Sequence, residues 1–305
     1  AGYHPVCYDN FSTGHRSCVN GPVVTGDIAD KAALARAFAE HDIVAVMHFA
    51  AASRVGESMV DPQKYYLNNL AGTLALLDVM RAAGCNRLVF SSSGAVYGNA
   101  DSKALPEDYP CAPINPYGAS KWMIERVLAD YRGAYGLGSF ALRYFNASGA
   151  DPSGDIGEMR EVETRLIPRA MMALQGHVPD FAVFGDDYPT PDGTAIRDYI
   201  HVTDLAAAHV LALKLLLQGH SGRALNLGSG KGFSVREILA AIAAETGREV
   251  PHVVKPRRAG DPPYLVADAS AARATLNFHT AYSDLPTIIR TAWAWHKKAH
   301  PLKTG

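Results

Sequence analysis

The stretch Arg87-Leu-Val-Phe-Ser-Ser-Ser93 indicates the fold: it is a short apolar run that ends in three serines. A short run that is apolar on both faces is typical of a buried strand in a parallel sheet. The serines then lie at the carboxyl end of a strand, where open α/β sheets bind ligands. Four further runs follow the same pattern: residues 5–8, 23–24, 43–50 and 140–145.

Helical patterns separate these runs, and capping residues mark their starts. Asp61-Pro62 and Asn115-Pro116 each put a capping side chain before a proline at the first helical position, and Asp30 precedes an Ala- and Leu-rich segment. Strands that alternate with helices imply right-handed βαβ units. We therefore expect an α/β fold with a doubly wound parallel sheet, that is, a Rossmann domain.

A smaller α/β domain is expected after about Asn146, because residues 147–200 are rich in Gly, Pro and Asp. This half contains a helical pattern near 167–175 and a capping box that opens a helix at Ser234. The Pro- and Arg-rich segment 251–264 is expected to be a loop. We assign residues 1–146 to the first domain and 147–305 mainly to the second, with part of 196–230 returning to the first.

The composition excludes several classes of protein. The 305 residues are 48% hydrophobic and 19% charged, as in ordinary globular proteins. A net charge of −1 gives no basic excess for nucleic acid, and no apolar run reaches the ~18 residues of a membrane span. The four cysteines form no CxxC pair, which favours a reducing cytoplasm. The histidines lack metal-ligand spacing, so we expect no metal site.

Tyr117 and Lys121 are four residues apart on an expected helix and so share one face. A phenol has a pKa near 10, so a phenolate base at pH 7 needs a pKa lower by ~3 units, or about 4 kcal/mol. A lysine ammonium ~6 Å away supplies roughly 3 kcal/mol at an effective dielectric constant of about 20. Ser93 could hydrogen-bond the same substrate hydroxyl and shuttle its proton. The spacing alone favours an exposed pair, whereas the preceding serine-ended strand favours a catalytic site.

Motifs along essentially the whole chain resemble the extended short-chain dehydrogenase/reductases, and among them the UDP-glucose 4-epimerases. In the first half the matching strings are His48-Phe-Ala-Ala-Ala52, Val55-Gly-Glu-Ser58, Tyr65-Tyr-Leu-Asn-Asn69, Phe90-Ser-Ser-Ser-Gly-Ala-Val-Tyr-Gly98, Pro116-Tyr-Gly-Ala-Ser-Lys121 and Leu142-Arg-Tyr-Phe-Asn146. In the second half they are Asp187-Tyr-Pro-Thr190, Asp192-Gly-Thr194, Arg197-Asp-Tyr-Ile-His-Val202, Asn226-Leu-Gly228 and Arg257-Arg-Ala-Gly-Asp261.

The resemblance implies an NAD-dependent 4-epimerase that interconverts UDP-glucose and UDP-galactose. Tyr117, helped by Ser93, would deprotonate the sugar 4′-hydroxyl while hydride passes from C4′ to NAD. The resulting 4-keto sugar would rotate and take the hydride back on its other face. Lys121 would also hydrogen-bond the nicotinamide ribose.

NAD rather than NADP is implied, because a carboxylate at Asp9 would bind ribose hydroxyls and repel a 2′-phosphate. From the residues alone, Asp9 and Asp27 are equally well explained as turn residues. By resemblance the cofactor also contacts Asn10, Thr13, Gly14, Asp27, Ile28, Phe49, Ala50, Ala51, Ala52, Ser53, Asn68, Ser93, Tyr117, Lys121 and Phe145.

For the substrate, the resemblance assigns Arg197 and Arg258 to the UDP diphosphate and Asp261 to the uridine ribose. The guanidinium fork suits phosphate, although without the resemblance either arginine is explained as a surface charge. Leu265 occupies a position that limits pocket size in the family, and its intermediate size leaves N-acetylated sugars open. Arg165 replaces the Asn or His common at its position, so the inherited contact is not carried over there. The remaining expected substrate contacts are Ser93, Tyr117, Asn146, Leu166 and Phe184.

Other functions stay open. A related 4-epimerase would act on a UDP-N-acetylhexosamine, UDP-pentose or UDP-uronate. A catalytically inactive binding protein of the same fold is a further alternative, although such a protein has no need of Ser93, Tyr117 and Lys121. A 4,6-dehydratase is disfavoured, because that chemistry needs an acid pair where Gly94-Ala95 follows Ser93.

The resemblance also bears on assembly and on the start of the chain. It implies a homodimer through a four-helix bundle, for which the helices after Asp61 and Asn115 are candidates. Family members begin with a strand, a GxxGxxG turn and a helix, and this sequence holds no such motif. We therefore expect roughly 20 residues upstream of Ala1, and weak NAD binding and marginal folding in a polypeptide that starts there.

Overall fold

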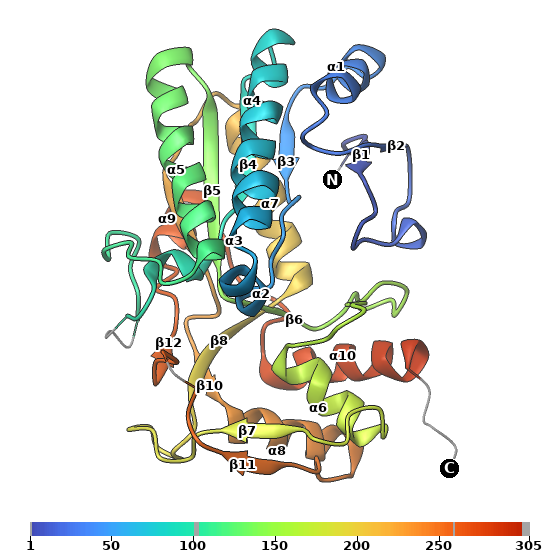
Figure 1. Ribbon diagram of the computed structural model, residues 1–305, viewed down its shortest axis with the longest axis vertical. Helices are drawn as coiled ribbons and strands as arrows, with labels where there is room; N and C mark the ends of the chain where they lie inside the picture. Colours follow the sequence, from blue (N-terminus) through green and yellow to red (C-terminus); the bar gives the residue numbers. More distant parts are fainter. Residues whose placement is uncertain (1, 101–103, 259, 301–305) are drawn as a thin grey trace. The chain divides into compact units, whose positions relative to one another are not determined.

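The chain folds into two compact units in the computed structural model, which describes residues 2–100, 104–258 and 260–300 (Figure 1). The first unit comprises Ala1–Gly98, Asp108–Arg143 and His209–Leu225. The second comprises Asn99–Glu107, Tyr144–Ala208 and Asn226–Gly305. Ala1 and Ala259, which fall in the chain start and loop discussed above, lie outside the described residues.

A four-stranded sheet forms the centre of the first unit, in the order β3-β4-β5-β9. Its β3/β4 and β4/β5 pairs are parallel, with Leu88 lying opposite Val46 on one side and Ser139 on the other. This parallel α/β arrangement confirms the expected fold class. The strands are β3 (Val46–His48), β4 (Arg87–Ser91), β5 (Gly138–Tyr144) and β9 (Ala224–Leu227).

The two strands expected nearest the start of the chain form a parallel pair of their own. In β1 (Cys7–Asp9) and β2 (Val23–Thr25), Cys7 lies opposite Val23. Among the described residues, no ladder of hydrogen bonds joins this pair to the four-stranded sheet. Apolar packing anchors the pair instead, since Ile28, just after β2, belongs to the same buried cluster as Leu88.

The helices expected after Asp30, Asp61 and Asn115 are confirmed. The carboxylate of Asp30 accepts a hydrogen bond from the backbone N–H of Ala33, and the amide oxygen of Asn115 accepts one from that of Gly118. The helices concerned are α1 (Lys31–Glu40), α3 (Pro62–Tyr65) and α5 (Pro116–Tyr135); α2 (Val55–Val60) precedes α3.

One turn of π-helix, Tyr66–Ala71, joins α3 to α4 (Gly72–Ala82) without a break. The α4 and α5 helices lie side by side over one face of the sheet (Figure 1). Leu77 of α4 and Ile124 of α5 are buried in one cluster with Phe90 of β4. This packing fixes α5 against the carboxyl end of β4.

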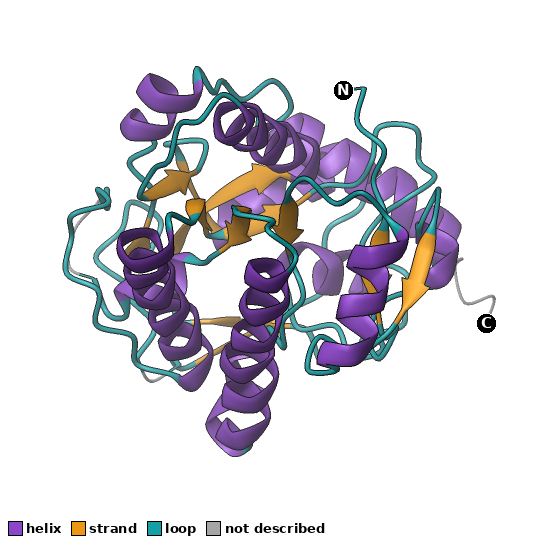
Figure 2. Cartoon of the chain, turned by 90° about the horizontal axis from the view of Figure 1, so that it is seen from above, coloured by secondary structure: helices purple, strands orange, loops and turns teal. Residues whose placement is uncertain are grey.

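The second unit is built around β8 (Ile196–His201). It pairs in parallel with β6 (Asn146–Ser148) and β12 (Tyr264–Leu265), and antiparallel with β10 (Gly232–Ser234). A separate parallel pair consists of β7 (Ala182–Phe184) and β11 (Val253–Lys255). The helices, drawn in purple in Figure 2, include α6 (Leu166–Leu174), α8 (Val235–Thr246), α9 (Ser270–Leu276) and α10 (Leu285–Ala299).

The capping box at Ser234 is confirmed: its hydroxyl accepts from the N–H of Glu237, whose carboxylate accepts from the N–H of Ser234. The prediction of a loop over residues 251–264 is wrong in part, because this segment contains β11 and the first residue of β12. Val253 and Val254 are β-branched and suit a strand, but the three residues of β11 are too few to show a period.

Helix α7 spans Val202–Leu217. It contains the apolar stretch 210–217, which Lys214 interrupts. None of the helices in the described ranges combines the length and hydropathy needed to cross a bilayer.

Candidate active site

Ser93 follows β4 and begins the short 3₁₀ helix Gly94–Tyr97. Its hydroxyl oxygen accepts a hydrogen bond from the N–H of Ala95 over 3.2 Å, and the residue is only 8% exposed. The three serines thus end the strand as expected. The side chain of Ser93 is held at the carboxyl edge of the sheet, where its own hydroxyl proton can be donated.

Tyr117 lies in the first turn of α5, and Lys121 follows one turn later. The Nζ of Lys121 is 6.0 Å from the centroid of the Tyr117 ring. It donates a hydrogen bond of 2.8 Å to the carbonyl oxygen of Ser91 and lies 4.7 Å from the centroid of the Phe90 ring. The structure therefore brings the lysine beside the tyrosine and ties it to the strand that carries Ser93.

Lys121 is 2% exposed, and this burial lowers its pKa to about 7, while the charge of Glu125 acts to raise it. A group whose pKa lies near neutrality can change charge during a reaction. His48 lies in the same interior, and burial followed by the charge of Lys121 lowers its pKa to about 3. His48 is thus neutral, and its Nε2 lies 2.8 Å from the hydroxyl of Thr73.

The loop at 50–53, expected to line the cofactor, is held by Asn69 from the π-helical turn. The amide of Asn69 accepts from the N–H of Ala52 over 2.8 Å and donates to the carbonyl oxygen of Ala52 over 3.0 Å. It also donates to the hydroxyl of Ser120 on α5, and Asn68 donates to it. Such π-helical turns occur frequently at functional sites, and this one connects the loop to the helix that carries Tyr117.

Asp9 stands at the end of β1, where a carboxylate for a ribose is expected. One of its oxygens accepts from the N–H of Phe11 over 2.7 Å. Phe11 has a φ of +52°, a left-handed conformation that is uncommon for a non-glycine residue. A Cβ on Gly14 would lie 3.6 Å from both carboxylate oxygens, so a glycine leaves that flank of Asp9 open.

The other residues expected near NAD are placed as follows. Asn10 donates to the carboxylate of Asp27 over 2.8 Å, which fixes the loops after β1 and β2 to each other. Ile28 faces the core, so any contact with an adenine would involve its backbone. Phe49 is 54% exposed, with its ring 4.7 Å from that of His209. Thr13, Ala50 and Ser53 are exposed, Ala51 is half-buried, and Phe145 lies in the second unit.

The residues present fit NAD at its two riboses. Asp9 offers a carboxylate with an open flank, and Lys121 offers an ammonium next to Tyr117. The described residues contain no glycine-rich GxxGxxG turn for the pyrophosphate.

In the second unit, the residues expected to contact the substrate fall into two pairs. Arg197 on β8 donates to the carboxylate of Asp261 over 2.9 Å, and both side chains are only partly exposed. The guanidinium of Arg258 lies 4.0 Å from the centroid of the Phe184 ring. Cations and an aromatic face, side by side, can hold a diphosphate and a base.

The remaining substrate candidates lie on neighbouring elements of the second unit. Asn146 donates to the carbonyl oxygen of Asp198 over 2.9 Å, and Leu265 lies opposite Arg197 in the β8/β12 pairing. Leu166 is half-buried at the start of α6. Arg165, just before it, pairs with Glu158 over 3.0 Å, so its charge is already partly balanced.

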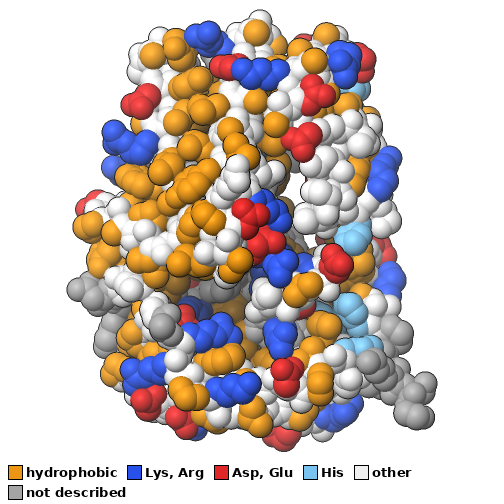
Figure 3. Space-filling model, in the orientation of Figure 1, with side chains coloured by type: hydrophobic (Ala, Val, Ile, Leu, Met, Phe, Trp, Pro, Cys, Tyr) orange, Lys and Arg blue, Asp and Glu red, His pale blue; other side chains and the backbone are white. Residues whose placement is uncertain are grey.

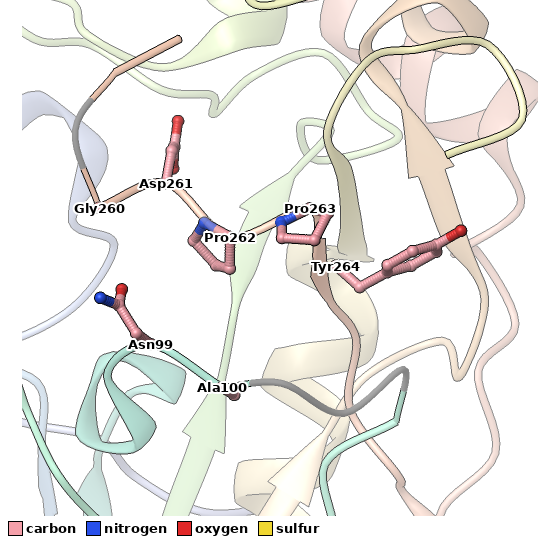
Figure 4. Close-up of a pocket in the computed structure, with 7 residues that line it drawn as sticks. All are labelled: Asn99, Ala100, Gly260, Asp261, Pro262, Pro263 and Tyr264. Atoms are coloured by element: carbon pink, nitrogen blue, oxygen red, sulfur yellow. The ribbon is translucent and has the colours of Figure 1, made fainter. Parts of the chain in front are cut away.

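A cavity of about 380 Å³ adjoins Asp261. It is lined by Asn99 and Ala100 from one segment and by Gly260–Tyr264 from another (Figure 4). Of the predicted substrate residues, only Asp261 lines this cavity. The structure thus groups Arg197 with Asp261 and Arg258 with Phe184.

Comparison with known proteins agrees with this geometry. The model of the "NAD dependent epimerase/dehydratase family" matches residues 1–228. A UDP-glucose 4-epimerase of Rhizobium leguminosarum bv. trifolii is 50% identical over 300 residues, which cover 98% of this chain and 91% of the relative. The chain belongs to the NAD-dependent epimerase/dehydratase family.

Solved structures of this family superimpose closely. UDP-glucose 4-epimerase from Brucella ovis in complex with NAD has a TM-score of 0.94 and 55% identity, covering 96% of this chain and 90% of the other. UDP-glucose-4-epimerase from Stenotrophomonas maltophila, with bound NAD and formylated UDP-arabinopyranose, has a TM-score of 0.94 and 40% identity, covering 98% and 92%. Both are described as complexes with NAD.

Two buried residues of this family member escaped the sequence prediction. Glu125 lies one turn after Lys121 on α5, and its carboxylate pairs with Arg143 of β5 over 2.6 Å. A signal for the pair is present, because Arg143 interrupts an otherwise apolar strand and so requires a buried partner. The spacing of Lys121 and Glu125 puts that partner on the helix face that carries Tyr117 and Lys121.

Proposed function

We propose that this protein is an NAD-dependent 4-epimerase that interconverts UDP-glucose and UDP-galactose. The observation that carries the proposal is the position of the buried Lys121, with its Nζ 6.0 Å from the Tyr117 ring centroid and hydrogen-bonded to the strand that leads to Ser93. The name shared by the relatives from Rhizobium and Brucella supports the proposal.

Tyr117 acts as the base in this proposal. Its phenolate takes the proton of the sugar 4′-hydroxyl, and the hydroxyl of Ser93 hydrogen-bonds the same oxygen and relays the proton. The charged ammonium of Lys121 favours the ionised phenol. Bound NAD would supply reversible hydride acceptance at C4′, so the reaction would have no net redox change. Tyr117 finally returns its proton to the 4′-oxygen of the product.

The cofactor is held mainly by residues of the first unit. Asp9 binds the adenosine ribose and Lys121 the nicotinamide ribose, while the loop fixed by Asn69 lines the space near the cofactor. Phe145 and the other residues assigned by resemblance complete the proposed contacts. A carboxylate at Asp9 favours NAD over its 2′-phosphorylated form.

The UDP part is held by residues of the second unit. Arg197 and Arg258 supply the positive charge for the diphosphate, Asp261 accepts from the uridine ribose, and Phe184 faces the uracil. Asn146, Leu166 and Leu265 contact the diphosphate or sugar. The cavity beside Asp261 supports this assignment.

The alternative substrate class rests on Leu265, whose intermediate size at the position that limits pocket size in the family leaves a larger or differently substituted sugar open. The Stenotrophomonas structure holds a UDP-pentose derivative. We therefore propose a UDP-N-acetylhexosamine, UDP-pentose or UDP-uronate as the alternative substrate of the same site.

We further propose that two copies associate through α4 and α5 of the first unit. Hydrophobic side chains gather on the face that these helices present in Figure 3. Leu74 of α4 and Met123 of α5 are 36% and 41% exposed, and Leu67, in the π-helical turn before α4, is 57% exposed. Contiguous exposed apolar surface of this kind often marks a protein interface.

We place the protein in the cytoplasm. Its four cysteines are all free thiols, the state expected in a reducing compartment. A fluorescent fusion of the protein is expected to label the cytoplasm, and export of the fusion would contradict this location.

Purified protein supplied with NAD and UDP-galactose tests the main proposal. We expect UDP-glucose to form until the two sugars reach equilibrium, without net reduction of NAD. Parallel assays with UDP-N-acetylgalactosamine, UDP-xylose and a UDP-uronate test the alternative. If one of these sugars is turned over and UDP-galactose is not, the protein is an epimerase for that substrate class. If none of the four UDP-sugars is turned over, both proposals are contradicted.

A further inference from the structure

Helix α5 holds the carboxyl end of β4 at two consecutive residues. The Nζ of Lys121 donates to the carbonyl oxygen of Ser91, and the hydroxyl of Ser92 donates to the carboxylate of Glu125 over 2.5 Å. Ser93 is the next residue along the chain. Tyr117, Lys121 and Glu125 are spaced by four residues each, so one helix face carries the proposed base, the lysine and the clamp on the serine strand.

Glu125 is itself held by a buried ion pair. Arg143 donates to one carboxylate oxygen through Nε over 3.0 Å and to the other through Nη2 over 2.6 Å. Its Nη1 donates to the hydroxyl of Tyr97, in the turn that follows Ser93. Burial acts to lower the pKa of Arg143, and the hydrogen bonds and charge of Glu125 raise it above its ordinary value. The guanidinium of Arg143 therefore stays charged, and the side chains of Arg143 and Glu125 are only 4% and 6% exposed.

The charges that face Lys121 make Glu125 important. Burial favours the uncharged form of Lys121, and His48 is a buried neutral neighbour. The centroid of the Tyr117 ring lies 6.0 Å from the Nζ of Lys121. Arg143 adds a second positive charge behind Glu125. Removal of the Glu125 carboxylate would leave two cations in one interior and would discharge Lys121 more readily.

We propose that Glu125 is a positioning residue of the Ser93–Tyr117–Lys121 site: its carboxylate, clamped by Arg143, fixes the serine strand through Ser92 and keeps Lys121 charged beside Tyr117. The inference rests on the proposed function. It assigns Glu125 two separable effects, one through a hydrogen bond and one through charge.

Four variants separate these effects. Glu125→Gln keeps an acceptor for Ser92 and removes the charge, and Glu125→Gln combined with Arg143→Met avoids an unpaired buried guanidinium. Glu125→Asp keeps the charge on a shorter side chain. Ser92→Ala removes the hydrogen bond and leaves every charge in place.

The pH dependence of the Tyr117 phenol is the main readout. It is measured as the ultraviolet absorbance of the ionised phenol, taken as the difference between each background and the same background with Tyr117→Phe. We expect the midpoint to move up by about one pH unit in both variants that lack the carboxylate, and to stay unchanged in Glu125→Asp and Ser92→Ala.

Turnover of UDP-galactose is the second readout. We expect kcat at pH 7 to fall about tenfold in the charge-removing variants, with KM within about twofold and with partial recovery at higher pH. Ser92→Ala is expected to lower kcat about threefold at every pH. A purely structural glutamate would lower the yield of folded protein and leave the midpoint and the pH profile unmoved.

Two results would overturn the inference: an unchanged phenol midpoint in the folded charge-removing variants, or a midpoint in Glu125→Asp that moves as far as in Glu125→Gln. If neither charge-removing variant folds, a Ser92→Ala variant with unaltered kcat overturns it as well. Failure of the proposed function is distinguishable, because the unmodified protein would then not turn over UDP-galactose while the phenol titration still decides the role of Glu125.

Discussion

Tyr117 is the residue on which the proposed reaction depends most. We predict that Tyr117→Phe lowers kcat for UDP-galactose by about 10³-fold, because general base catalysis contributes roughly that factor. The Tyr117 ring is half-buried and lies edge-on to the Tyr65 ring, with 6.4 Å between the two ring centroids. Phenylalanine keeps this contact, so the temperature midpoint of unfolding should stay within a few degrees. Steady-state kinetics and thermal unfolding check both expectations.

Tyr131 provides the matched control for Tyr117→Phe. It lies on the same helix, with its ring against that of Tyr135 at 5.0 Å. Tyr131→Phe is expected to keep kcat within about twofold. An active Tyr117→Phe variant would remove Tyr117 as the base.

Lys121 gives a prediction for stability against pH. Its pKa is lowered to about 7 by burial, whereas an exposed lysine titrates near 10.4. Between these values the unfolded chain binds more protons than the folded chain, so the lysine makes stability rise with pH across that window. Below pH 7 the full cost of charging the buried group, roughly 5 kcal/mol, is present.

The variant Lys121→Met removes this titration. We predict that its free energy of unfolding exceeds that of the unmodified protein at pH 6 to 7, and that the difference shrinks as the pH rises toward 10. Urea unfolding at several pH values measures the difference. A difference that is constant with pH would contradict the burial cost, and a loss of activity at every pH is expected in the same variant.

At the residue scale, the positions of site residues that depend on local spacing could be predicted from the sequence. Tyr117 and Lys121 are one helical turn apart, and Ser93 ends an apolar strand, so each position could be read from the chain. Arg143 stands out as a charge in an apolar strand, but its partner Glu125 could not be read from the chain, because the pairing depends on which strand packs beneath α5. The two residues are 18 positions apart, and they meet only because β5 lies next to β4.

The start of α5 positions Tyr117, the proposed base. A Cβ on Gly118, next to Tyr117, would stand 2.5 Å from the carbonyl oxygen of Ala95 in the 3₁₀ turn. Backbone lies at that position and has little room to shift. We predict that Gly118→Ala pushes α5 away from the turn after Ser93 and lowers kcat by at least about tenfold, measured with UDP-galactose.

Gly133 on the same helix is the control for Gly118. A Cβ there meets nothing within 4 Å, and the residue is exposed. Gly133→Ala is expected to stabilise the protein by about 0.5–1 kcal/mol and to leave kcat unaltered. Equal effects of the two substitutions would show that close approach at Gly118 is not what limits the site.

At the element scale, long amphipathic helices with capping residues were predictable, and short or irregular elements were not. The caps at Asp30, Asn115 and Ser234 act within four residues, so the sequence contains the whole signal. The π-helical turn at Tyr66–Ala71 has no such signal, since it follows from the bonds of Asn69 to Ala52 and Ser120. The strand β11 is defined by its pairing with β7. Val253 of β11 lies opposite Ala182 of β7, which is 71 residues earlier in the chain.

At the scale of the whole molecule, each compact unit is assembled from three segments of the chain. The segment Asn99–Glu107 is assigned to the second unit, where the N–H of Leu105 donates to the carbonyl oxygen of Val266 and its own carbonyl oxygen accepts from Asn226. These contacts span more than a hundred residues. Composition indicates a change near Asn146, but it does not indicate that the segment Asn99–Glu107 belongs to the second unit, because that assignment depends on the order of strands.

The apolar surface on α4 and α5 leads to a prediction about assembly. Leu74 and Met123 are exposed on these neighbouring helices, and burying them between two copies would remove apolar area from water on both. We predict that the protein sediments as a dimer, and that Leu74→Glu combined with Met123→Glu shifts it to a monomer, because like charges would face each other across the interface. Val254→Glu on β11 is the control, since Val254 is 50% exposed in the second unit and should leave the sedimentation coefficient unchanged. A dimer that survives the double substitution would place the interface elsewhere, and a monomeric unmodified protein would remove the homodimer from the proposal.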